Sequence, residues 1–156
     1  MLSLLPVSAR RDIEAVRELF AAYARAVDEP CCFAGFEREL ATLPGEYAPP
    51  TGRLLLARAG DAAAGCVGLR RLDTATAEMK RLYVRPASRG LGLGRALAEA
   101  AIAAAREAGY SRLVLDRLPK MREAAALYGS LRFRPIPPYL EQPTPGALCF
   151  ELTLQP

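Results

Sequence analysis

The sequence predicts a single α/β domain, residues 1–156, built on a mixed and mostly antiparallel sheet. Three strand-like runs follow one another through short turns between residues 53 and 84, which is typical of an antiparallel meander. A long alanine-rich helix then leads to a short apolar run at 112–116, an arrangement that favours a parallel strand pair. With 51% hydrophobic and 24% charged residues, the 156-residue chain has a globular composition and can bury a sizeable core.

The N-terminal third is expected to hold one strand and two helices. Leu2–Val7 opens as a strand, and the helix that follows runs to about Val27. Its apolar positions share one face, so Tyr23 on that face is interpreted as a core residue, the alternative being a ligand contact. Apolar positions from Phe33 to Leu43 predict a second, shorter amphipathic helix. This helix and the loop after it are candidates for one wall of a substrate cleft.

The rest of the chain alternates between strands and helices. The expected strands are Arg53–Ala59, Ala64–Leu72, Ala77–Val84, Arg112–Asp116, Phe133–Ile136 and Ala147–Leu154. The expected helices are Arg95–Ala108, which Gly109 terminates, and Met121–Leu131. A proline-rich loop, PPYLEQPTPG, separates the last two strands.

Charge and hydropathy exclude several classes of protein. The net charge is +4, but the arginines are scattered, whereas a nucleic-acid surface needs clustered charge with interleaved aromatic residues. Binding to DNA or RNA is therefore not expected. No apolar run approaches the ~20 residues of a membrane span. The N-terminus lacks the basic start and apolar core of a signal peptide, so the expected location is cytoplasmic.

The chain contains no histidine, which removes Ser/His and Cys/His nucleophile systems. The four cysteines show no metal-ligand spacing, so no metal site is expected. Any proton transfer must therefore rely on Glu, Asp, Tyr, Cys or Lys.

The most informative stretch runs from Glu78 to Gly94, EMKRLYVRPASRGLGLG. Glycines at alternate positions let successive N–H groups converge on an anion, and the helix that follows adds its unpaired N–H groups. A Walker-type loop is excluded because Gly94 is followed by Arg95-Ala96. The dinucleotide fingerprint is disfavoured because GxGxxG is not met and five residues separate the strand from the first glycine.

The hexamer RGLGLG matches [Q/R]-x-x-G-x-[G/A], and it is preceded by E-x-x-x-L-Y-V-x-P. A helix follows, and A-A-x-L-Y-x-x-L-x-F occurs at Ala124 to Phe133. These motifs, in this order, resemble the GNAT superfamily of N-acetyltransferases, and the proline-rich ending looks like a bacterial subgroup. The resemblance implies the GNAT acyltransferase fold, in which a central parallel strand pair splays apart. It also implies acetyl-CoA as donor.

The resemblance assigns the cofactor contacts to two segments. Backbone groups of Leu82, Tyr83 and Val84 would bind the pantetheine arm. The pyrophosphate would be surrounded by N–H groups of Arg89, Gly90, Leu91, Gly92, Leu93, Gly94 and Arg95.

Two residues are candidates for catalysis through the same resemblance. Glu78 occupies the position of a general base in that family. The reaction needs a base because an ammonium must lose a proton before its nitrogen attacks a thioester. Alternatively, Glu78 anchors the ammonium or pairs with an arginine such as Arg81. Tyr128 aligns with a tyrosine that protonates the departing thiolate, the alternative being that it only completes an apolar helix face.

The sequence departs from the family pattern at two positions. Met121 replaces an asparagine that contacts the coenzyme, and Arg132 replaces the glycine before Phe133. The second change requires a residue other than glycine to end the helix, which affects stability more than activity.

The expected acceptor of the acetyl group is a primary amine of a small molecule or peptide, and the sequence does not identify it further. Tyr139 and Glu141 in the proline-rich loop are candidate contacts, the alternative being a purely structural loop. A homodimer is compatible with the sequence. The main alternative function is a non-catalytic acyl-CoA-binding regulatory or partner module.

Overall fold

The computed structural model describes residues 2–7 and 9–154, and its described strands form one seven-stranded sheet. The strands are β1 (Leu2–Pro6), β2 (Arg53–Ala59), β3 (Ala62–Arg71), β4 (Thr76–Val84), β5 (Arg112–Arg117), β6 (Arg134–Ile136) and β7 (Leu148–Thr153). The helices are α1 (Arg10–Val27), α2 (Phe36–Thr42), α3 (Leu93–Glu107) and α4 (Arg122–Ser130), with short 3-10 turns η1 (Pro30–Phe33), η2 (Gly45–Tyr47) and η3 (Pro86–Ser88).

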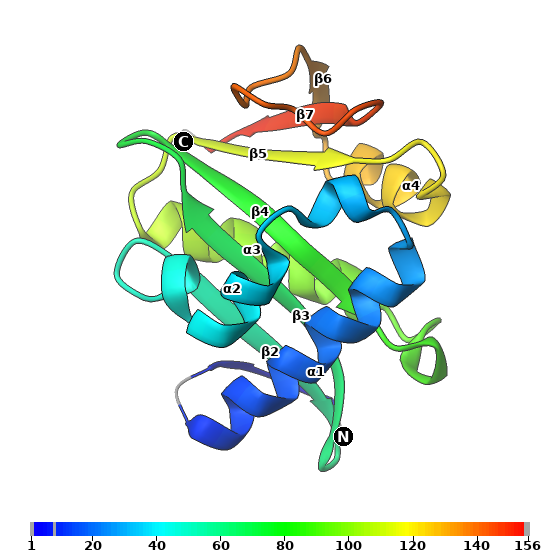
Figure 1. Cartoon of the computed structure of the whole chain (residues 1–156). Helices are drawn as coiled ribbons and strands as arrows, with labels where there is room; N and C mark the ends of the chain where they lie inside the picture. Colours follow the sequence, from blue (N-terminus) through cyan, green and yellow to red (C-terminus); the bar gives the residue numbers. More distant parts are fainter. Residues whose placement is uncertain (1, 8, 155–156) are drawn as a thin grey trace.

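The strand order is β1-β2-β3-β4-β5-β7-β6, and β4 and β5 form the parallel pair while all other neighbours are antiparallel. The expected meander and the helix-connected parallel strand are both confirmed. A right-handed crossover places the connecting helix α3 on one face of the sheet, and α1 and α2 cover the other face (Figure 1).

Two apolar cores follow from this layering. The alternation of side chains along β3, β4 and β5 sends Leu69, Met79 and Leu113 to the side of α3, where they join its buried alanines and leucines. On the other face Val16, Leu19 and Phe20 of α1 pack against β2 and β3. Apolar side chains therefore fill both faces, except near the C-terminal ends of β4 and β5.

At those ends the parallel strands separate. Register pairing between β4 and β5 ends at Glu78 and Val114, although both strands continue beyond these residues. On its other edge β4 carries a bulge, because the register with β3 jumps from Lys80 to Tyr83. The splayed central pair implied by the family resemblance is present.

The bulge requires Arg81 to adopt a left-handed conformation, with φ of 61°. Its guanidinium is held by a two-pronged ion pair with Glu39 of α2, at 2.9 Å from Nε and 2.8 Å from Nη2. The guanidinium also lies over the Phe33 ring, 4.7 Å from its centroid. Since Arg81 is only 7% exposed, this pair fixes the bulge from the α2 side.

The expected second helix is wrong in one respect. Residues 30–43 form two short pieces, η1 and α2, because Gly35 interrupts them with φ of 72°. α2 and η2 line a cavity of about 230 Å³, and the expectation that this segment forms one wall of a substrate cleft stays a prediction.

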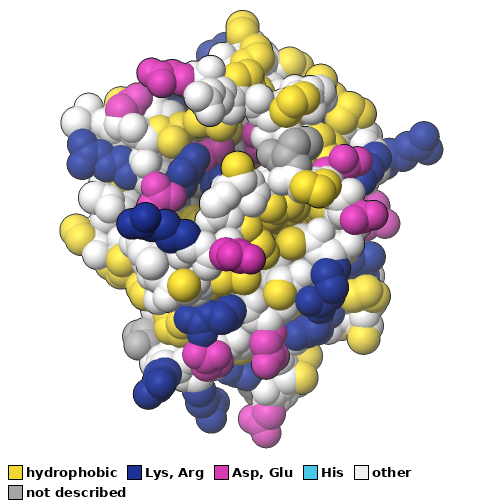
Figure 2. Space-filling model, in the orientation of Figure 1, with side chains coloured by type: hydrophobic (Ala, Val, Ile, Leu, Met, Phe, Trp, Pro, Cys, Tyr) yellow, Lys and Arg dark blue, Asp and Glu magenta, His cyan; other side chains and the backbone are white. Residues whose placement is uncertain are grey.

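Within residues 2–7 and 9–154, no helix combines the length and the apolar character needed to cross a bilayer. On the face shown in Figure 2, basic and acidic side chains are interspersed, and no continuous basic surface is visible. This distribution agrees with the scattered arginines of the sequence.

Candidate active site

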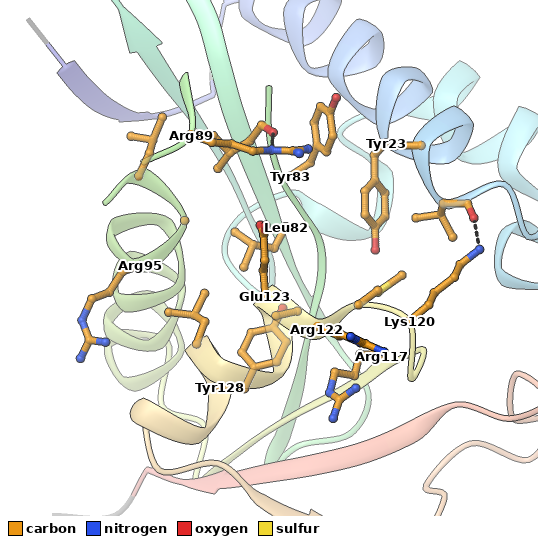
Figure 3. A pocket seen from close by; sticks show the side chains of 18 of the residues that line it. Tyr23, Leu82, Tyr83, Arg89, Arg95, Arg117, Lys120, Arg122, Glu123 and Tyr128 are labelled. Atoms are coloured by element: carbon orange, nitrogen blue, oxygen red, sulfur yellow. Dashed lines mark hydrogen bonds between the residues drawn. The ribbon is translucent and has the colours of Figure 1, made fainter. Parts of the chain in front are cut away.

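A cavity of about 700 Å³ opens where β4 and β5 separate, and it is lined by α1, the ends of both strands, the glycine loop, α3 and α4 (Figure 3). The cavity brings together most of the site residues that the sequence suggests. Its lining includes Leu82, Tyr83, Val84, Arg89, Gly90, Gly92, Leu93, Gly94, Arg95 and Tyr128. Leu91 points into solvent at 60% exposure, and Glu78, Tyr139 and Glu141 are not among the lining residues.

The glycine loop presents unpaired donors to this cavity. Gly90 and Gly92 have φ of 82° and 76°, a conformation that side-chain-bearing residues rarely adopt. Within the described residues, no backbone or side-chain group accepts a hydrogen bond from the N–H groups of residues 90–95. Together with the positive end of the α3 dipole, these donors form a concave anion site.

Arg89 departs from the expected arrangement. Its N–H donates to the Pro86 carbonyl at 3.3 Å, so it is not a free donor. Its side chain turns back and donates from Nε to the Val84 carbonyl at 3.0 Å. The contribution of Arg89 to an anion site is therefore its charge.

The backbone of Leu82–Val84 lines the cavity beyond the last β4–β5 pair, so its edge toward β5 has no strand partner. Leu82 lies in the bulge and has no register partner in β3 either. This segment offers backbone groups for an extended ligand lying between the strands.

Tyr128 is positioned by the way α4 ends. The helix closes with a Schellman motif, in which Phe133 N–H donates to the Tyr128 carbonyl at 3.1 Å and Arg132 N–H donates to Gly129 at 3.0 Å. The rings of Tyr128 and Phe133 meet edge to face with centroids 5.7 Å apart. Arg132 takes the left-handed position with φ of 71°, the strained helix end anticipated from the sequence.

The hydroxyl of Tyr128 has no hydrogen-bond partner within the described part of the chain, although the residue is only 8% exposed. Burial raises the pKa of Tyr128, and the nearby charge of Arg117 acts in the opposite direction. Tyr128 therefore enters the cavity as a neutral phenol with a free hydroxyl.

Glu78 is 1% exposed and fully engaged. Arg70 Nε donates to one carboxylate oxygen at 2.6 Å, and the Tyr139 hydroxyl donates to the other at 2.5 Å. Arg70, not Arg81, is its ion-pair partner, because the bulge turns Arg81 toward Glu39. Tyr139 therefore attaches the proline-rich loop to the sheet, and Glu141 beside it is exposed.

Several residues that line the cavity had no assigned role from the sequence, and two of them carry polar groups into it. Asp116 lies at the end of β5, and Tyr23 reaches the cavity from α1, opposite Tyr128 (Figure 3). Tyr23 does pack against Tyr83 and Phe33, as expected of a core residue, but it also lines the cavity. Burial raises its pKa to about 12. For Asp116, a polar residue ending an apolar strand was the available signal.

Apart from its own backbone, Asp116 forms no hydrogen bond or ion pair through its side chain with any other described residue. Burial and the negative charge of Glu78 raise its pKa. A half-buried carboxylate with a raised pKa, facing a cavity, has the properties of a general base.

The neighbouring residue Arg117 also lines the cavity without an ion pair within the described residues. Its guanidinium lies over the Phe150 ring at 5.2 Å, and its Nε is buried without a hydrogen-bond partner. This cation is therefore uncompensated and close to Tyr128.

Comparisons with known proteins agree with this geometry. The model of the acetyltransferase (GNAT) family matches residues 13–133. The chain belongs to this family. An uncharacterized N-acetyltransferase of Schizosaccharomyces pombe is 35% identical over 155 residues, covering 98% of this chain and 95% of the relative. Because this relative comes from a yeast, the resemblance is not confined to bacteria.

Solved structures share the fold of this acetyltransferase at low sequence identity. An acetyltransferase from Streptococcus agalactiae superposes with a TM-score of 0.83 and 19% identity over 98% of both chains. The yncA structure from Salmonella typhimurium, solved with its cofactor acetyl-CoA, has a TM-score of 0.76 and 18% identity, covering all of this chain and 95% of that chain.

Within residues 2–7 and 9–154, no group of three or more His, Cys, Asp or Glu side chains is arranged to hold a metal ion. Met121 stands where the resemblance expects an asparagine. It is the N-cap residue of α4, its side chain makes no capping hydrogen bond, and it lines the cavity.

Proposed function

We propose that this acetyltransferase binds acetyl-CoA in the 700 Å³ cavity and transfers the acetyl group to a primary amine by direct attack. The observation that carries the proposal is the union, in one cavity, of an unpaired N–H cradle, an unpaired strand edge, a free phenol and a free carboxylate.

The donor would lie along the N-terminus of α3. The N–H groups of residues 90–95 bind the pyrophosphate, with Arg89 and Arg95 contributing positive charge at the rim. The pantetheine arm extends along Leu82–Val84, where the backbone edge lacks a partner strand. Backbone N–H groups in this segment polarise the thioester carbonyl.

The acceptor would approach from the face covered by α1 and α2. Asp116 takes the proton that an ammonium must lose, and the neutral nitrogen attacks the carbonyl carbon. The C–N bond forms and the C–S bond breaks. The nitrogen then loses its second proton to bulk water, which also returns a proton to the Tyr128 phenolate. We assign the base role to Asp116 in place of Glu78, because Glu78 is enclosed by Arg70 and Tyr139.

The leaving thiolate receives its proton from Tyr128. Burial raises the pKa of Tyr128 and so disfavours this transfer, which makes the uncompensated charge of Arg117 important. That charge stabilises negative charge on the sulfur or on the phenolate as the proton moves. Glu78 contributes by holding the proline-rich loop and by raising the pKa of Asp116.

The test is a thiol-release assay with acetyl-CoA and a panel of amines, comparing wild type with Asp116→Asn and Tyr128→Phe. Each variant should lose roughly 10²- to 10⁴-fold in kcat while CoA affinity stays within a few-fold. Glu123→Gln is the matched control, since it removes an exposed carboxylate from the rim of the same cavity.

The pH profile gives a second readout. The base must be ionised, and its pKa is raised, so the acidic limb of kcat/KM should lie above the usual carboxyl range and disappear in Asp116→Asn. CoA binding without thiol release from any amine would instead support a non-catalytic binding module. Failure to bind CoA would refute the proposal.

A further inference from the structure

The sheet face toward α1 and α2 carries charged side chains whose pairing can be followed one by one. Arg70 pairs with Glu78 and with Glu46, at 2.6 and 3.0 Å. Arg81 pairs with Glu39 at 2.8 Å. After these pairs are formed, Lys80 and Asp116 remain, and neither side chain has an ion pair or a hydrogen bond with another described residue.

These two residues occupy related positions on the separating strands. Glu78 and Val114 form the last register pair of β4 and β5. Two residues further along each strand, the alternation of side chains puts Lys80 and Asp116 on the same face as Glu78, on opposite sides of the gap. Because the strands no longer pair there, these opposite charges stay more than 4.0 Å apart.

We propose that the acceptor is zwitterionic, a small amine that also carries a carboxylate, with its amine at Asp116 and its carboxylate at Lys80. This inference rests on the proposed function and specifies its substrate class as free amino acids or related amino carboxylates. It disfavours peptide N-termini, whose α-carboxyl group is an amide.

Electrostatics support this assignment. Both charges are half-buried, and each is costly without a partner. Burial and the charge of Arg81 lower the pKa of Lys80, whereas burial raises that of Asp116. A zwitterion would stabilise both charged forms and leave the site neutral. A simple cationic amine would pair with Asp116 but place a second positive charge near Lys80 and Arg81.

The acceptor specificity tests this directly. Matched sets of an amino acid, its carboxamide and its decarboxylated amine are compared in the thiol-release assay. Wild type should favour the amino acid over its carboxamide by roughly 10- to 100-fold in kcat/KM, the range expected for a hydrogen bond to a charged group. Lys80→Met should remove this preference by slowing the amino acid and not the carboxamide, while Lys80→Arg should retain much of it.

Lys120→Met is the matched control, because it removes a lysine that lines the 700 Å³ cavity but whose ammonium already has partners. Lys120 donates to the Glu29 carboxylate and to the Val27 carbonyl. It should keep the wild-type preference. Calorimetric binding of the same compounds to the CoA-loaded protein provides a readout independent of turnover, and amino acids should bind wild type more tightly than their carboxamides.

The outcomes separate the two proposals. Acetylation of amines with equal kcat/KM for acid and carboxamide would overturn the zwitterion inference and leave acetyl transfer intact. Equal binding of acid and carboxamide to the CoA complex, or a preference unchanged in Lys80→Met, would overturn it as well. If no thiol is released but amino acids bind in a way that depends on Lys80, catalysis is refuted and the binding subsite is supported.

Discussion

The proposed site has a donor side, which lies in the 700 Å³ cavity, and an acceptor side on the adjoining face of the sheet, and the two sides are built from different chemical groups. The donor side consists mainly of backbone, namely the N–H groups of residues 90–95 and the unpaired edge of Leu82–Val84. The acceptor side consists of side chains, namely Asp116, Lys80, and the ion pairs of Arg70 and Arg81 that surround them. The first is suited to phosphate and amide groups through its backbone conformation, and the second is suited to a charged ligand.

This difference has a consequence for substitution. Changing a side chain of the glycine loop should matter little for CoA binding unless the backbone conformation changes with it. At the ion pairs of the acceptor side, removing one charge leaves its buried partner uncompensated, so the effect should be large. The following predictions test this contrast.

The largest effect is expected for Glu39→Gln, which removes the charge paired with Arg81. Because Arg81 is 7% exposed, its uncompensated charge should lower the free energy of unfolding by about 3–5 kcal/mol. Denaturant unfolding measures this loss, and acetyl transfer should fall as well, since the pair fixes the bulge of β4. Glu37→Gln, an exposed change on the same helix, should stay within roughly 0.5 kcal/mol.

The pH dependence of this loss has a definite sign. Burial alone would raise the pKa of Glu39, but the hydrogen bonds and charge of Arg81 lower it overall. A depressed folded-state pKa means that the stabilisation is complete above the unfolded-state pKa and disappears as pH falls through the folded-state value. The gap between wild type and Glu39→Gln should therefore be full at neutral pH and shrink in acid. A constant gap would show that the pair is not the source of the stability.

A smaller effect is expected for Gly92→Ala on the donor side. An added Cβ at Gly92 would meet no atom within 4 Å, so the change acts through φ of 76° alone. The left-handed conformation should cost about 1–2 kcal/mol, seen as a roughly tenfold weaker Kd for CoA. Calorimetry of CoA binding measures it.

Gly94→Ala in the same loop distinguishes the effect of backbone conformation from the effect of the room taken up by an added Cβ. Gly94 is not in the left-handed region, and its added Cβ would make only ordinary contacts, 3.9 Å from Val84 Cγ2. We expect near wild-type CoA affinity and a slightly more stable helix. Equal weakening by both alanines would show that room for the ligand matters more than backbone conformation.

The fold was largely predictable because its signals are local. The β2–β3–β4 meander, the alanine-rich α3 and the helix-linked β5 each follow from residue periodicity and short connections. The exception was residues 30–43, where Gly35 divides one apolar pattern between η1 and α2. Whether a glycine ends a helix depends on φ, which a pattern of apolar positions does not specify.

The donor site was predictable for the same reason, since its donors are consecutive residues. The acceptor side was not, because its residues come from β3, β4, β5, α2 and the proline-rich loop. Which arginine pairs with Glu78 depends on the bulge, and the bulge turns Arg81 toward Glu39. The importance of Asp116 appears only when the point of strand separation is known.

The smallest expected effect on catalysis belongs to Arg132→Gly, which relaxes a strained position without changing any charge pair. α3 and α4 end with the same Schellman motif, but α3 has Gly109 at the left-handed position and α4 has Arg132, with φ of 92° and 71°. Glycine at 132 should raise the free energy of unfolding by roughly 1 kcal/mol, measured in urea, and Gly109→Arg should lower it by a similar amount. Because Phe133 and the Tyr128 carbonyl keep their hydrogen bond, kcat should not change. A lower kcat in Arg132→Gly would mean that the strained helix end itself positions the Tyr128 hydroxyl.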